Sequence, residues 1–258
     1  MNSTFEFSRA SYRAILERAC ALDYRICNFR SFVPPAEQPV LLLRHDLDHS
    51  IRSAVVLAEI EAELGLQATY FVQVGCDFYN LLSSESRAHI ARITELGHEI
   101  GLHYEAPHYV GAEGRQRLAT SIALLADLAG HPIRSASQHI PIDNDFLDLS
   151  GYIDQEAYEA RFTKGAMTYI SDSLMRWRQA TPHDLLDSRS SFQLLTHPMK
   201  WVADFSDMDQ ALAFALHDEQ QFLAQRSAQI AAYYRDLLSR RAELDAAFKA
   251  SRRHQGEA

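Results

Sequence analysis

The sequence has little positive charge compared with its negative charge. Of its 258 residues, 25 are Lys or Arg and 34 are Asp or Glu, which gives a formal net charge of −9. Proteins that bind nucleic acid use clustered Lys and Arg side chains to contact phosphates, and this sequence has no such cluster. We therefore expect no nucleic-acid partner.

The sequence also lacks a cysteine framework and long apolar runs. Its three cysteines, Cys20, Cys27 and Cys76, are too few and too widely spaced for a disulfide scaffold or a cysteine zinc site. Apolar runs such as Val40–Leu43 are far shorter than the roughly 20 residues of a membrane helix. The first residues do not resemble a secretory signal. We expect a cytoplasmic protein with reduced thiols and no membrane span.

Several enzyme motifs are missing, whereas histidine is abundant. The sequence contains no G-x-S-x-G, no phosphate-binding G-x-x-x-x-G-K-[ST] and no G-x-G-x-x-G. Apolar residues make up 47% of the chain, which is enough for a large core, and eight of the twelve histidines lie between His45 and His139. This concentration makes a metal site worth considering.

Strand and helix patterns alternate through the first half of the chain. We expect a helix within residues 5–30, and later helices and strands at 40–45, 53–64, 67–74, 86–96, 98–103, 115–128, 133–139, 167–170 and 192–196. Residues 141–166 have no clear pattern. The alternation indicates parallel strands with helical crossovers, in one domain of residues 1–258 with a core at about 40–205.

Polar residues follow several of these expected strands, and this favours a barrel over an open doubly wound sheet. The carboxyl ends of barrel strands are where active sites are built. The residues at these positions are Asp46, Asp48, His103, His139, Asp172 and His197. We therefore expect an α/β fold, a distorted (β/α) barrel with added N- and C-terminal helices.

Residues 206–258 are expected to form a C-terminal helical extension. Apolar residues recur there at every seventh position: Leu216, Leu223, Ile230, Leu237 and Leu244. Such a stripe can pack on the barrel or pair with a second copy of the chain. The companion positions are mostly polar, which weakens the second alternative, and a homodimer through this helix remains open.

The segment Arg44-His-Asp-Leu-Asp48 places two carboxylates two residues apart at a strand end. If the extended backbone continues, both point to the same side, where a cation would relieve their repulsion. They could instead be capping residues in a surface loop. His103 leaves a nearby strand, and imidazole with carboxylate is a zinc-type ligand set. We expect His98 to have a structural role.

Four segments together resemble the polysaccharide deacetylase family, carbohydrate esterase family 4. They are R-H-D-L-D, A-T-Y-F-V, G-H-E-I-G-L-H and L-L-T-H-P, and they extend from about residue 40 to 201. The first is similar to the H-D-V-D branch, which is associated with sugar-polymer and O-antigen biosynthesis. The resemblance implies a distorted barrel that binds a divalent metal ion, most often zinc, through one aspartate and two histidines.

The positions of residues within these four motifs suggest which residues would have the family's catalytic and metal-binding roles. By resemblance Asp46 is the general base, Asp48 and His103 are metal ligands, and His197 is the general acid. The family's second metal histidine would stand at position 107, which is Pro107 here. The third ligand is therefore open between His139, His108 and Glu105. The family's arginine partner of the base is also missing, and Arg44 or Arg176 could replace it.

The resemblance further suggests residues that act around His197. Asp172 matches an aspartate that orients the acid histidine, although it could simply cap a turn. Trp177, flanked by Arg176, matches a tryptophan that lines the sugar groove, although it could belong to the core. Trp201 could contact sugar or anchor a lid. We include Arg176, Trp177 and Trp201 as predicted substrate-binding residues.

The predicted function is therefore a metal-dependent N-deacetylase. Its substrate would be an N-acetylated or N-formylated amino sugar in a polysaccharide or its precursor. The alternative is a catalytically degenerate barrel that binds a glycan or a partner protein in polysaccharide biosynthesis. A third interpretation keeps the metal chemistry and changes the bond to a small amide or a sugar O-ester.

Overall fold

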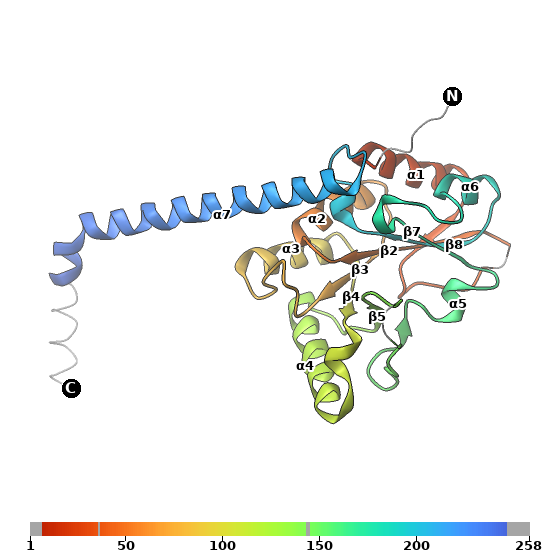
Figure 1. Cartoon of the computed structure of the whole chain (residues 1–258), viewed down its shortest axis with the longest axis horizontal. Coiled ribbons are helices and arrows are strands. Elements are labelled where there is room, and N and C mark those ends of the chain that lie inside the picture. The colour runs from red at the N-terminus through yellow and green to blue at the C-terminus, as the bar shows by residue number, and fades with distance from the viewer. Residues whose placement is uncertain (1–6, 36, 143–144, 247–258) are drawn as a thin grey trace. The chain divides into compact units, whose positions relative to one another are not determined.

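A curled parallel sheet with surrounding helices makes up the larger part of the protein in its computed structural model (Figure 1). The structure describes residues 7–35, 37–142 and 145–246. The chain divides into two compact units, with the boundary between Ala211 and Leu212.

All the described strand pairs of the sheet are parallel. The order is β6-β5-β4-β3-β2-β8-β7, and β1 also pairs with β2. The strands are β1 (Arg25–Cys27), β2 (Val40–Leu47), β3 (Thr69–Gln73), β4 (Glu99–Tyr104), β5 (Ser135–Gln138), β6 (Gln155–Glu156), β7 (Thr168–Ser171) and β8 (Phe192–Thr196). The outermost strands of this order, β6 and β7, share no described ladder, so the barrel is open on one side. The expected distorted (β/α) barrel is confirmed.

Helices α1 to α6 surround the sheet. They are α1 (Arg9–Ala21), α2 (Ile51–Glu63), α3 (Ser84–Glu95), α4 (Gly111–Ala129), α5 (Ala160–Thr163) and α6 (Pro182–Asp187). A seventh helix, α7 (Met208–Ser239), follows the last strand. Helix α1 contacts α6 and α2, and α3 lies between α2 and α4. Short 3-10 turns follow β4, β7 and β8: η1 (Ala106–Tyr109), η2 (Ser173–Met175) and η3 (Pro198–Lys200).

Local sequence signals explain where several helices begin and end. The hydroxyl groups of Ser8, Ser50 and Ser83 accept backbone N–H groups at the starts of α1, α2 and α3. Gly130, with φ of 70°, ends α4 in the left-handed conformation that glycine adopts without strain.

The two faces of strand β2 have different surroundings: one faces the inside of the barrel and the other faces helix α2. The strand is buried along its whole length. Side chains alternate along a strand. Arg44 and Asp46 point into the barrel, where they contact each other. His45 points the other way and contacts Glu61 of α2.

Two regions differ from the sequence-based expectation. The helix expected within 5–30 is α1, which stops at Ala21, because Asp23 adopts a left-handed conformation (φ 53°) and the chain then enters β1. The unassigned region 141–166 contains β6 and α5 in its described part. Both elements are too short to produce a periodic pattern in the sequence.

The second compact unit contains most of α7 and the residues that follow it. The long helix expected after residue 206 is present as Met208–Ser239. Leu216, Leu223 and Ile230 of the heptad stripe are exposed. Within the described ranges no helix has the length and hydrophobicity of a membrane span.

Candidate functional site

Five predicted site residues lie at the carboxyl ends of four strands. Asp46 is one residue before the end of β2 and Asp48 follows the strand, His103 is near the end of β4, His139 follows β5 and His197 follows β8. In a parallel sheet these ends share one edge. The sheet therefore brings together residues that are up to about 150 positions apart in sequence.

Asp48, His103 and His139 form a group that could hold a metal ion. One ligand atom from each residue lies within 4.8 Å of the others. The Nε2 atom of His103 is 3.1 Å from Oδ1 of Asp48, and Nε2 of His139 is 4.0 Å from the same oxygen. One carboxylate and two imidazoles fit zinc or a similar divalent cation.

The two other candidates for the third ligand lie outside this group. Glu105 faces the far side of the His139 ring, with its Oε1 atom 3.3 Å from Nδ1. The Nε2 atom of His108 is 3.5 Å from Oε2 of Glu105, and 62% of its side chain is exposed. The structure thus gathers His139, and not His108, beside Asp48 and His103.

Hydrogen bonds orient both imidazoles of the group. Nδ1–H of His103 donates to the Ser137 carbonyl at 2.8 Å, which leaves Nε2 facing Asp48. Glu105 plays the same part for His139 by accepting from its Nδ1. A hydrogen bond at the far nitrogen is typical of histidines that bind metals, because it sets the ring orientation and raises the basicity of the ligand nitrogen.

The charge of Asp48 is stabilised by its neighbours. Burial alone would raise the pKa of this carboxyl, but the imidazoles of His197, His103 and His139 hold the pKa well below its usual range. Asp48 is therefore ionised at neutral pH.

Asp46 lies deeper in the barrel than Asp48. Its Oδ2 atom accepts a hydrogen bond from the Ser137 hydroxyl at 3.1 Å and lies 3.4 Å from Nη2 of Arg44. Its other oxygen, Oδ1, has no hydrogen-bond partner in the described part of the chain. One oxygen is thus held in place, and the same oxygen lies 3.9 Å from Nε2 of His103.

Arg44 is the arginine that contacts Asp46. It is fully buried, and its guanidinium lies 4.6 Å from the ring centroid of Tyr158. Arg176, the other candidate for this position, is exposed in the loop after η2. The structure therefore provides Asp46 with a cationic neighbour from its own strand.

His197 and Asp172 form a tightly bonded pair. Nδ1–H of His197 donates to Oδ1 of Asp172 at 2.5 Å, and the backbone N–H of His197 donates to Oδ2 at 2.9 Å. Nε2 of His197 faces the metal-binding group, 3.4 Å from Oδ2 of Asp48. Burial would raise the pKa of Asp172, but Lys200 and His197 lower it to about 2.

Two residues of the turn after His197 also support Asp172. The indole N–H of Trp201 donates to Oδ2 at 2.7 Å, and Nζ of Lys200 lies 3.4 Å from Oδ1. Trp201 is fully buried, so the prediction that it contacts substrate is wrong: its ring has no surface to offer a sugar.

Trp177 and Arg176 lie in the loop after η2. Trp177 is half-buried, with its ring stacked 6.0 Å from that of Phe7, and Arg176 is exposed. Substrate contact by these two residues stays a prediction.

Ser137, Glu105 and Lys200 belong to the site although the sequence did not predict their contacts. Ser137 contacts both Asp46 and His103, because register pairs it with His103 across β4 and β5. Their contacts could not be read from the sequence, because each partner is distant in sequence or is reached through a turn whose geometry the sequence does not specify.

A second polar cluster lies on the opposite, helix-covered face of β2. Glu61 accepts hydrogen bonds from His45 at 2.7 Å, from Tyr70 at 2.7 Å and from Tyr12. His98 lies next to it, donating from Nε2 to Ala58 and accepting the Ala68 N–H at Nδ1. These contacts place His98 in the interior.

No family model and no curated protein matches the chain. Similar solved structures include a family 4 carbohydrate esterase from Bacillus anthracis, with a TM-score of 0.41, 14% identity and coverage of 80% of this chain and 84% of that one. A chitin deacetylase from the fungus Colletotrichum lindemuthianum has a TM-score of 0.44 and 15% identity over 72% and 85%. A pseudoenzyme of the CE4 family from Bacillus anthracis has a TM-score of 0.42 and 12% identity over 74% and 66%. The likeness is one of general fold and assigns no activity to this chain.

Proposed function

We propose that the chain is a metal-dependent hydrolase that removes an N-acyl group, acetyl or formyl, from an amino sugar of a polysaccharide or its precursor. One observation supports this most: the Asp48–His103–His139 group has Asp46 on one side and His197 on another. Amide hydrolysis uses these three parts, a cation, a base and an acid.

Asp48, His103 and His139 are the proposed ligands, and zinc is the proposed ion because it favours nitrogen and oxygen ligands of this kind. The chemistry that such an ion supplies when bound is Lewis acidity toward an acyl carbonyl and toward water. The protein's own contribution is to orient the two imidazoles through Ser137 and Glu105.

Asp46 is the proposed general base. Its carboxylate lies 3.9 Å from Nε2 of His103 and would take a proton from the attacking water. Ser137 and Arg44 hold Oδ2 and so fix the carboxylate in one orientation. A base held in place loses less entropy when it reacts.

His197 is the proposed general acid. As the water oxygen bonds to the acyl carbon and the C–N bond breaks, Nε2 of His197 would give its proton to the leaving nitrogen. The products are the carboxylic acid and the free amine. Asp172 holds the opposite nitrogen and stabilises the charged imidazole before the transfer.

Other predictions extend this proposal. We propose Arg176 and Trp177 as residues that contact the sugar. The cytoplasmic location, the O-antigen association and pairing through the C-terminal helix stay predictions of the sequence.

Two substitutions test the proposal. Asp46→Asn should lower amine release by about 100-fold or more and leave the metal content near normal. Asp48→Ala should remove the bound metal. Purified protein that holds no divalent ion after incubation with zinc would contradict the proposal. Saturable glycan binding by the unmodified, metal-loaded protein without amine release would support the degenerate-barrel alternative instead.

A further inference from the structure

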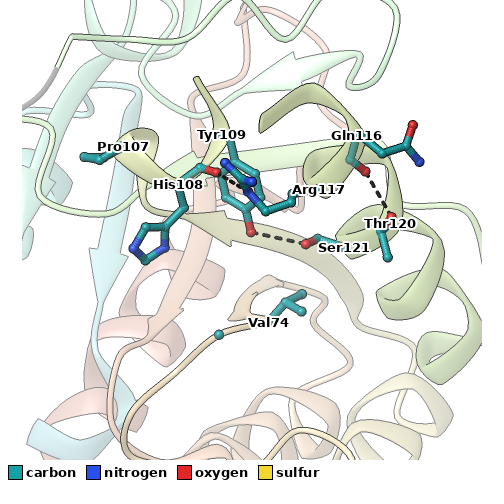
Figure 2. A pocket seen from close by; sticks show the side chains of 9 residues that line it. Val74, Pro107, His108, Tyr109, Gln116, Arg117, Thr120 and Ser121 are labelled. Atoms are coloured by element: carbon teal, nitrogen blue, oxygen red, sulfur yellow. Dashed lines mark hydrogen bonds between the residues drawn. The ribbon is translucent and has the colours of Figure 1, made fainter. Parts of the chain in front are cut away.

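A pocket opens beside the proposed metal group, between the end of β3 and the η1–α4 segment (Figure 2). Its volume is about 540 Å³. Its walls include Val74 on one side and Pro107, His108, Tyr109 and Thr120 on the other. The pocket does not include any proposed metal ligand.

A small cavity lies between this pocket and the metal group. It has a volume of about 30 Å³ and is lined by His103 and Glu105. Val74, His108 and Tyr109 line both spaces. A substrate group placed at His103 could therefore continue into the larger pocket. The connecting cavity is small, because about 30 Å³ is the volume that one water molecule occupies in the liquid.

The walls of the larger pocket suit an apolar group. The surface that they expose is mostly apolar, with Val74, Pro107 and the Tyr109 ring contributing. Two polar groups in the wall already have partners within it: the Tyr109 hydroxyl lies 3.2 Å from that of Ser121, and Nε of Arg117 donates to the His108 carbonyl at 2.9 Å. A sugar ring would need free hydrogen-bonding partners, whereas a hydrocarbon chain needs none.

The position of the pocket indicates which part of the substrate it receives. In the sheet order β8-β2-β3-β4, His197 follows β8, whereas Val74 follows β3 and His103 ends β4. If the leaving nitrogen faces His197, as the proposed function requires, the acyl group extends to the opposite side of Asp48. That side contains the pocket.

We propose that this pocket binds the acyl chain of the substrate and that the amide hydrolysed carries a chain of about four to eight carbons. The inference rests on the proposed function and extends it from acetyl and formyl groups to longer acyl groups. Each methylene buried there should improve kcat/KM by about two- to fourfold until the pocket is filled.

The test uses the full-length, metal-loaded protein and N-acetyl-, N-butanoyl-, N-hexanoyl- and N-octanoylglucosamine, with amine release as the readout. We expect kcat/KM to rise from acetyl to hexanoyl. Thr120→Trp would fill the pocket from α4 and should lower the hexanoyl-to-acetyl ratio of kcat/KM at least tenfold. Ala123→Trp, at an exposed position of the same helix outside the pocket, is the matched control and should leave the ratio unchanged.

Three other results would overturn the inference. The first is a kcat/KM for amine release that falls as the acyl chain lengthens, or a hexanoyl-to-acetyl ratio that Thr120→Trp does not alter; the proposed function would then stand. The second is a preference for N,N′-diacetylchitobiose over N-acetylglucosamine that Thr120→Trp removes, which would place a second sugar ring in the pocket. The third is no amine release from any compound with the metal bound, which would reject the proposed function as well.

Discussion

Single hydrogen bonds determine which nitrogen of each imidazole faces Asp48. His103 is fixed by the Ser137 carbonyl and His139 by the Glu105 carboxylate. Ser137 is buried, whereas Glu105 is partly exposed and carries a charge. Substitution at Glu105 therefore probes the metal group without opening the core.

Glu105→Gln should weaken metal binding by about tenfold or more, because the neutral amide holds Nδ1 of His139 less strongly and lowers the basicity of Nε2. Metal affinity measured by competition with a chelator checks this. Glu113→Gln, at an exposed glutamate of α4, is the control. An unchanged affinity in Glu105→Gln would mean that His139 is not a ligand.

Asp172→Asn should reduce kcat by about 100- to 10,000-fold and leave the metal content unchanged. The carboxylate stabilises the charged His197 and fixes its ring, and an amide provides neither effect in full. Steady-state kinetics together with metal analysis measure both quantities. Activity within a few-fold of the unmodified protein would remove His197 from the role of acid; Asp187→Asn, at an exposed carboxylate, controls for the loss of charge.

The sequence could predict the positions of the main site residues better than their supporting contacts. Asp46, Asp48 and His103 stand directly at strand ends, and parallel strands bring such ends together. Lys200 and Trp201 reach Asp172 only because η3 folds back after His197. The prediction that Trp201 contacts substrate is wrong because the side chain is buried, and a single aromatic residue in a sequence does not reveal its burial.

At the scale of elements, β2 separates two polar clusters of different character. Its inward face leads to Asp46 and the proposed site, and its outward face contacts Glu61. Glu61 is fully buried, and His45 and two tyrosines satisfy its oxygens. This second cluster fastens α1 and α2 to the strand that positions the proposed base.

The Glu61 cluster should make the fold sensitive to acid. Burial lowers the pKa of His98, so below about pH 6.5 the folded protein binds fewer protons than the unfolded chain. The free energy of unfolding therefore falls as the pH decreases through this range. Burial would raise the pKa of Glu61, but His45 lowers it below its usual 4.5, so the stability that Glu61 contributes is lost at still lower pH.

His98→Gln should reduce the stability lost between pH 7 and pH 5. Glutamine can donate to the Ala58 carbonyl and accept from the Ala68 N–H as His98 does, but it takes up no proton. The difference should be about 1.4 kcal/mol for each unit by which folding lowers the pKa of His98. Urea unfolding at several pH values measures it; equal pH dependence in both proteins would show that His98 contributes nothing.

The parallel sheet was the most predictable element of the fold, and its short elements were the least. β2, β3 and β4 are apolar runs bounded by polar or glycine residues, which makes them recognisable. β1 has three residues and β6 has two, so neither produces a pattern of its own. They join the sheet because tertiary pairing with β2 and β5 stabilises them.

At the scale of the whole molecule, every proposed metal and acid–base residue belongs to the first compact unit, residues 1–211. The heptad stripe belongs to the second, where Leu216, Leu223 and Ile230 are exposed. The proposed chemistry therefore depends on the barrel alone, and pairing of α7 with another copy stays a separate prediction.

Anomalous diffraction at the zinc edge, from crystals grown with zinc, tests the central claim most directly. The account predicts one strong peak about 2.0–2.2 Å from a carboxylate oxygen of Asp48 and from Nε2 of His103 and His139. No peak at this edge of the sheet, or a peak bound by His108 in place of His139, would contradict it.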